Sequence, residues 1–143
     1  MPQRPYYFLH VEDDADYAAL LEQKLSSFKI QHEMVLKKTG EEAWAYLMEA
    51  CEGSTPEKRI PDLIFLDILF PAEDGLATLK RIKAHDQLRN IPVIVVSISK
   101  DQNHVVQTYK LGGTFFMSKS SDPTLLKEVL NRLTMLSILK HSD

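Results

Sequence analysis

The sequence predicts an α/β fold with three layers, in which five helices cover both faces of a five-stranded parallel sheet. Short apolar runs alternate five times with amphipathic segments, which is the pattern of repeated strand–helix units. One run, Leu63–Leu66, is apolar throughout, as expected of a strand buried on both faces. A chain of 143 residues can bury one core, so we expect a single domain spanning 1–143, with its core at about 6–139.

Three strands and two helices are expected in the first half of the chain. The strand-like runs lie at 6–11, 32–37 and 63–66. The helical periodicities lie at 14–28 and 41–51. Asp14 is a suitable N-cap for the first helix, and Gly40 separates the second strand from the second helix.

Two strands and three helices are expected in the second half. The strand-like runs lie at 92–97 and 114–118. The helical segments lie at 76–85, 105–111 and 121–141. Glycines at 112 and 113 end the fourth helix, and Pro123 suits the first turn of the last helix, with Ser121 or Asp122 as its cap.

Composition excludes several classes of protein. The net charge of −3 gives no reason to expect nucleic acid or an anionic membrane as a partner. Acidic residues gather in 1–76, with 15 acids and 7 bases, and basic residues in 77–143, with 10 bases and 5 acids, which suits an acidic pocket beside a mildly basic face. The single cysteine, Cys51, excludes an internal disulfide and a cysteine-based zinc site. With no signal peptide and no membrane-length apolar run, we expect a cytoplasmic protein.

Polar side chains follow four of the five predicted strands. These residues are Glu12 and Asp13, Asp67, Ser97 and Lys119. Because the carboxyl ends of parallel strands meet at one rim, where open α/β sheets bind ligands, we expect them to lie together. Each residue alone has an ordinary explanation as a helix cap, a strand end or a solvated lysine. Their shared position favours one functional site.

The chemistry of this set favours a metal and a phosphoryl group. Converging carboxylates raise the pKa of at least one of them unless a cation offsets their charge. Oxygen ligands favour Mg²⁺, and Mn²⁺ would also fit. Lys119 and Ser97 add a cation and a hydroxyl donor that could neutralise a phosphoryl group. Asp67 is the best placed carboxylate to act as a nucleophile and form an acyl phosphate.

From about residue 6 to 139 the chain resembles the receiver domain of two-component response regulators. The family pattern of aspartate, two residues, methionine, proline, two residues, aspartate and glycine matches Asp67 to Gly75, with Phe70 in the methionine position. Pro71 and Asp74 complete the match. The resemblance implies a flavodoxin-like, doubly wound sheet with strand order 2-1-3-4-5.

The same resemblance implies a role for each residue of the rim. Asp67 would be the phosphoacceptor. The metal ligands would be Glu12, Asp13, Asp67 and the backbone carbonyl of Leu69. The phosphoryl-binding and switch residues would be Ser97, Lys119 and Phe116. Asp13 and Asp14 could form the acidic pair instead, although the position directly after Val11 favours Glu12 and Asp13. Phe116 fits a switch aromatic and an ordinary core residue equally well.

The implied function is a phosphorylation-dependent signalling switch and not an enzyme with turnover. A sensor histidine kinase, as in regulators paired with phytochrome-like kinases, would supply the phosphoryl group. No output segment is expected after the last helix, so the signal would pass through contacts with a downstream protein. Met135, Ile138 and Leu139 would either close the core or form a homodimer face.

Three departures from the family pattern keep a second hypothesis open. Ile98 stands where a small residue is usual, Ser120 where proline is usual, and the apolar Leu69 follows the phosphoacceptor by two positions. Ile98 and Ser120 would suit an interaction adaptor that is not phosphorylated. Leu69 argues against an aspartyl phosphohydrolase, which needs an acid there, and it predicts a long-lived phosphoaspartate.

Overall fold

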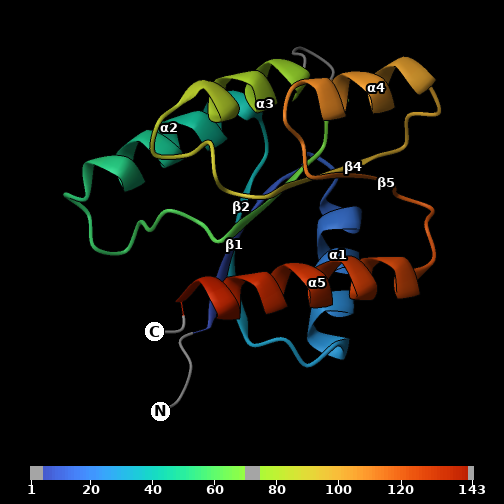
Figure 1. Cartoon of the computed structure of the whole chain (residues 1–143), viewed down its shortest axis with the longest axis horizontal. Coiled ribbons are helices and arrows are strands. Elements are labelled where there is room, and N and C mark those ends of the chain that lie inside the picture. The colour runs from blue at the N-terminus through green and yellow to red at the C-terminus, as the bar shows by residue number, and fades with distance from the viewer. Residues whose placement is uncertain (1–4, 70–74, 142–143) are drawn as a thin grey trace.

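The computed structural model describes residues 5–69 and 75–141, and side chains as far as Leu133. Its sheet has five parallel strands in the order β2-β1-β3-β4-β5, which confirms the predicted topology (Figure 1). The strands are β1 (Tyr6–Val11), β2 (His32–Lys37), β3 (Leu63–Leu66), β4 (Val93–Ser97) and β5 (Phe115–Ser118). In this order β1, β3 and β4 are inner strands, so residues at their carboxyl ends lie at the middle of one rim.

Five helices complete the three layers. They are α1 (Ala15–Ser27), α2 (Gly40–Glu52), α3 (Gly75–Ala84), α4 (Gln102–Lys110) and α5 (Pro123–His141). Helices α1 and α5 cover one face of the sheet, and α2, α3 and α4 cover the other (Figure 1). In the part of the chain that the structure describes, no helix has the length and apolar character needed to cross a bilayer.

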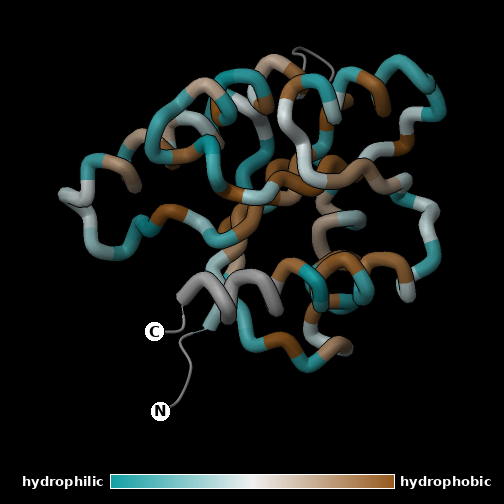
Figure 2. Tube along the Cα trace, viewed as in Figure 1, coloured by the Kyte–Doolittle hydropathy of each residue, from teal (hydrophilic) through white to brown (hydrophobic). Residues whose placement is uncertain are grey.

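Two apolar cores form because side chains of a strand point alternately to opposite faces. On the α2–α3 face, Leu9 and Ile64 pack with Leu47 and Leu79. On the α1–α5 face, Phe8 and Phe65 belong to the core that also buries Leu21 and Leu130. Figure 2 shows the most hydrophobic part of the trace along the strands, between helices with mixed surfaces. Both faces of the sheet are therefore covered, and its polar chemistry lies at the strand ends.

Local hydrogen bonds account for where the helices begin. Asp14 caps α1, as predicted, through its side chain and the backbone N–H groups of Asp16 and Tyr17. Thr39 caps α2, so Gly40 is its first residue and does not stand outside it. The expected start of the fourth helix at 105 is wrong, because Asp101 caps α4 through the N–H of Asn103 at 2.9 Å and starts it at 102.

Candidate functional site

The acidic residues predicted for the rim lie together. Ligand oxygens of Glu12, Asp13 and Asp67 all lie within 4.8 Å of one another. Glu12 and Asp67 are buried, whereas Asp13 is exposed to solvent. Asp14 instead accepts backbone hydrogen bonds in the first turn of α1. The geometry therefore favours Glu12 and Asp13 as the acidic pair over Asp13 and Asp14.

Asp67 is held in place by the backbone around it. Its N–H donates to the carbonyl of Val11 at 3.0 Å, which continues the β1–β3 ladder to the rim. Its side chain is buried, and its Oδ1 accepts from the N–H of Leu69 at 3.0 Å. Gly75 passes so close that a Cβ there would lie 2.5 Å from the carbonyl oxygen of Asp67 and 2.4 Å from the Cα of Ile68. Only glycine fits at that approach.

Lys119 joins the two buried carboxylates from the end of β5. Its Nζ donates to Oε2 of Glu12 at 2.9 Å and to Oδ2 of Asp67 at 3.1 Å. It also lies 4.7 Å from the centre of the Tyr17 ring, within the range of a cation–π contact. The sequence does not indicate this contact between Tyr17 and Lys119.

The electrostatics of the site follow from burial and from this shared cation. Burial raises the pKa of Glu12 to about 7, the charge of Asp67 adds to the rise, and the hydrogen bond from Lys119 opposes it. Burial alone would lower the pKa of Lys119, but its bond to Glu12 and the charges of both carboxylates outweigh burial and raise it. Burial, with the charges of Glu12 and Asp67 adding to it, raises the pKa of Tyr17 to about 12, so the phenol stays neutral.

These residues fit a hard divalent cation. The cluster offers only oxygen ligands, and the exposed Asp13 gives solvent access to it. Burial and the charge of Asp67 raise the pKa of Glu12, so a cation in addition to Lys119 would help to keep Glu12 ionised. Glu12, Asp13 and Asp67 would therefore hold the ion beside Lys119.

Ser97 lies at the end of β4 and is fully buried. Its hydroxyl accepts from the N–H of Ser99 at 3.1 Å, and its carbonyl accepts from the N–H of Lys119 at 2.9 Å. Ser99 in turn makes a short hydrogen bond with Nδ1 of His104 in α4. The Ser97 backbone thus belongs to the rim, while its side chain faces the loop between β4 and α4. Beside it, Ile98 is 66% exposed.

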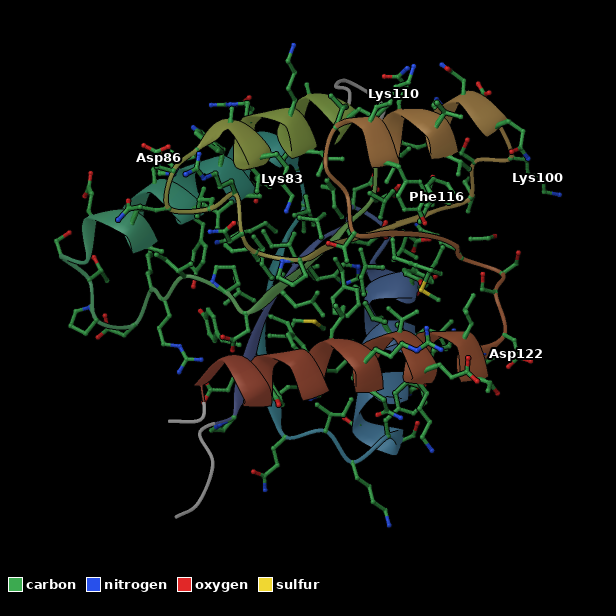
Figure 3. The ribbon with its side chains drawn as sticks, viewed as in Figure 1. Lys83, Asp86, Lys100, Lys110, Phe116 and Asp122 are labelled. Atoms are coloured by element: carbon green, nitrogen blue, oxygen red, sulfur yellow. The ribbon has the colours of Figure 1, made fainter. Side chains whose placement is uncertain are left out.

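Phe116 packs partly buried against the core on the α2–α3 face. Figure 3 shows it on the same side of the sheet as α4. Its backbone N–H donates to the hydroxyl of Tyr109 at 3.2 Å. This hydrogen bond connects β5 to α4, and the sequence did not indicate it. Of the predicted motif, Phe70, Pro71 and Asp74 lie outside the described residues.

Comparison with known proteins places the chain in a family. A family model, the response regulator receiver domain, matches residues 8–131. The chain belongs to the response-regulator receiver domains. Receiver domains are generally signalling switches of two-component systems and not enzymes. The match begins within β1 and ends within α5, so it includes the other four strands in full and the rim residues that follow the strands.

Individual receiver domains are also similar to the chain. Response regulator Rcp1 of Synechocystis sp. is 32% identical over 116 residues, which cover 81% of this chain and 78% of Rcp1. A structure of the Mn²⁺-bound form of Rcp1 matches with a TM-score of 0.75 at 29% identity, covering 90% of this chain and 91% of Rcp1. The phosphorylated cyanobacterial phytochrome response regulator RcpA matches with a TM-score of 0.76 at 31% identity, covering 91% of both chains.

Proposed function

We propose that this receiver domain accepts a phosphoryl group on Asp67 and signals through altered contacts with other proteins. The observation that carries the proposal is the position of Asp67, which is 4% exposed, borders two further carboxylates and lies 3.1 Å from the Nζ of Lys119. A buried carboxylate that shares one cation with a neighbour is suited to be a nucleophile whose product carries more negative charge. The phosphorylated form of RcpA supports the same reading by similarity.

The metal is proposed to be Mg²⁺, with Mn²⁺ as a working substitute. Glu12, Asp13 and Asp67 would hold it with the backbone carbonyl of Leu69, and the Mn²⁺-bound form of the similar Rcp1 supports a divalent ion here. Bound there, the ion offsets negative charge on the phosphoryl oxygens. Lys119 is already within hydrogen-bond distance of Asp67 and would transfer one of its hydrogen bonds to a phosphoryl oxygen.

The proposed transfer is a displacement at phosphorus. An oxygen of Asp67 forms the new bond to phosphorus, and the bond to the phosphohistidine nitrogen of a sensor kinase breaks, leaving a neutral imidazole once that nitrogen is protonated. The chain catalyses only this transfer and the slow hydrolysis of its own product.

We propose that phosphorylation changes the protein's contacts through movements of Ser97 and Phe116. The Ser97 hydroxyl would leave the N–H of Ser99 and donate to the new anion, which would shift the loop and the α4–β5 surface. Phe116 would then turn further into the core that it already borders. A coupling free energy of about 1–3 kcal/mol between phosphorylation of Asp67 and partner binding at the α4–β5 surface would change partner affinity by about 5- to 150-fold.

The proposed partners are a sensor histidine kinase and a downstream protein, in the cytoplasm. A phytochrome-like kinase is favoured because the similar RcpA is a phytochrome response regulator. Homodimerisation through α5 remains a proposal, because Met135, Ile138 and Leu139 lie beyond the described side chains.

One assay tests the proposal. The purified chain is incubated with Mg²⁺ and acetyl phosphate, and the product is examined for a hydroxylamine-labile aspartyl phosphate. We expect a stoichiometric label in the wild type and none in Asp67→Asn, whose amide is nearly isosteric but a poor nucleophile. No label on the folded wild type would favour the non-phosphorylated adaptor, and continuous release of phosphate would favour a hydrolase.

Leu69 predicts that the phosphoaspartate is long-lived. Its side chain is 38% exposed at the site and has no polar group to orient an attacking water. Loss of label from the purified phosphoprotein should therefore be slower than from Leu69→Glu, whose carboxylate could accept a proton from that water. Equal rates in the two proteins would contradict this prediction.

A further inference from the structure

His10 is a buried polar residue that the function described so far does not use. It lies on β1, is 1% exposed, and meets the rings of Tyr17 and Phe65 edge to face, with centroids 6.2 and 6.0 Å away. Burial favours the neutral form of an imidazole, which offers one N–H donor and one acceptor.

Neither ring nitrogen of His10 has a hydrogen-bond partner within the described part of the chain, and neither does Oε1 of Glu12. These unpaired atoms face one another, with His10 Nε2 3.9 Å from Glu12 Oε1. His10 and Glu12 are two positions apart in an extended segment, so their side chains lie on the same face of the sheet. A buried donor or acceptor left unpaired costs about 1–3 kcal/mol, so two such groups this close are expected to satisfy each other.

Glu12 is otherwise held from only one side. Its Oε2 accepts from Lys119 at 2.9 Å and from the N–H of Asp14 at 3.2 Å, while Oε1 has no such contact with any residue that the structure describes. The Lys119 contact is shared with Asp67, and the proposed function requires Lys119 to turn toward a phosphoryl oxygen. A contact at Oε1 would hold the carboxylate independently of that movement.

We propose that His10 is a positioning residue for the metal site, donating its Nε2–H to Oε1 of Glu12 and so fixing the carboxylate that faces the cation. The gap must close by about 1 Å to reach a normal hydrogen-bond length, which a small rotation of the ring or the carboxylate can supply. Carboxylates that bind metals are commonly oriented by such an outer contact, and its loss typically weakens metal binding by about 10- to 100-fold. The inference rests on the proposed function, because it assigns Glu12 to that site.

The first test measures Mn²⁺ affinity by the electron paramagnetic resonance signal of the free ion. His10→Leu removes the donor, so we expect Mn²⁺ to bind about tenfold more weakly. His10→Gln carries an amide N–H near the position of Nε2 and should retain most of the affinity. His32→Leu is the matched control, since the side chain of His32 is also buried but bonds Glu22 at 2.6 Å, far along the sheet from the rim. It should bind Mn²⁺ as the wild type does.

The second test does not depend on any variant folding. Nitrogen-15 NMR of the wild type reports which nitrogen of His10 carries the hydrogen, and we expect the Nε2–H tautomer. The Nδ1–H tautomer, or unchanged Mn²⁺ affinity in folded His10→Leu, would overturn the proposal. If the wild type neither binds Mn²⁺ nor takes the label, the proposed function itself fails. If it does both while His10→Leu matches it, only the role of His10 fails.

Discussion

At the β1, β3 and β5 ends of the rim, Lys119 already contacts both Glu12 and Asp67, whereas at the β4 end the hydroxyl of Ser97 accepts from its own loop. We call the part of the rim formed by Glu12, Asp67 and Lys119 the assembled side. We call the part formed by Ser97 and the loop between β4 and α4 the loop side. On the assembled side, the groups that would receive a phosphoryl group stand within 3.1 Å of their neighbours before any donor arrives. On the loop side, the hydrogen bonds of the Ser97 and Ser99 hydroxyls connect the loop to itself and to α4.

This difference suggests how one small domain can combine fast chemistry with a switch. Preorganised charges need no rearrangement when the reaction occurs, so the assembled side serves the transfer. A switch needs a group whose contacts differ between two states, and Ser97 can exchange the N–H of Ser99 for a new anion. Changes on the assembled side should therefore damage the chemistry, and changes on the loop side should shift the balance between states.

The largest effect is expected from Gly75→Ala, on the assembled side. The new Cβ would lie 2.4 Å from the Cα of Ile68 and 2.5 Å from the carbonyl oxygen of Asp67, so the backbone that carries Asp67 must move. We expect the free energy of unfolding to fall by about 3 kcal/mol. Phosphorylation by acetyl phosphate should be abolished. Urea denaturation and the label assay measure the two effects.

Gly53→Ala is the control for Gly75→Ala. Gly53 has φ of 72°, but no atom of the described residues lies within 4 Å of an added Cβ, so the backbone conformation is what opposes the change. Its cost should be about 1 kcal/mol, with labelling unaffected. If both variants label as the wild type does, the close approach of Gly75 is not needed to place Asp67.

The next effect is expected from Lys119→Met, which removes the shared cation. Two buried carboxylates would then lack their partner, so we expect a loss of about 2 kcal/mol in unfolding free energy without metal, together with loss of labelling. Mg²⁺ should reduce the stability loss, because it supplies positive charge to the same carboxylates. Urea denaturation with EDTA and with Mg²⁺ gives both values.

Lys83→Met provides the comparison for Lys119→Met. The Nζ of Lys83 donates to the carbonyls of Arg89 and Ile91, away from the acidic cluster. Its removal should lower stability equally with and without Mg²⁺. If the loss in Lys119→Met were also independent of Mg²⁺, Lys119 and the metal would not act on the same carboxylates.

The sequence predicted the assembled side well because its features are local. A buried strand such as Leu63–Leu66 is evident from its apolar run, and parallel strands bring Glu12, Asp67 and Lys119 to one rim whatever the details of packing. The sequence favours Glu12 over Asp14 through its position directly after Val11, although both are acids beside a helix start. In the structure the N–H groups of Asp16 and Tyr17 donate to Asp14 as the cap, so the geometry favours the same choice.

Contacts that depend on side-chain direction could not be predicted from the sequence. The Tyr109 hydroxyl meets the N–H of Phe116 only because α4 packs beside β5, and the sequence indicates neither the angle nor the register of that packing. The contact proposed between His10 and Glu12 has a signal in the sequence, a histidine inside an apolar strand two positions before an acid. That its ring nitrogens are buried without a hydrogen-bond partner among the described residues appears only in three dimensions.

A smaller effect is expected from Ser99→Ala, on the loop side. Ser99 Oγ accepts from the N–H of Asp101 at 3.2 Å and bonds His104, so its loss should loosen the loop that holds the Ser97 hydroxyl. We expect about 1 kcal/mol less stability, and up to about a fivefold faster labelling if that energy opposes the switch. Ser27→Ala removes a single side-chain bond, to the carbonyl of Lys24 at 2.7 Å, and should not change labelling. Slower labelling in Ser99→Ala would mean that the closed loop assists transfer.

The smallest effect on stability is expected from Ile98→Ala, also on the loop side. Ile98 is 66% exposed beside the buried Ser97, so its truncation should change the free energy of unfolding by less than about 0.5 kcal/mol. Its bulk lies next to the site, so we expect faster labelling by a kinase domain and a smaller gain with acetyl phosphate, which needs less room. Val106→Ala, at a 46% exposed position on α4, controls for loss of exposed apolar surface. Equal gains with the two donors would show that Ile98 restricts the movement of the loop and not the approach of the kinase.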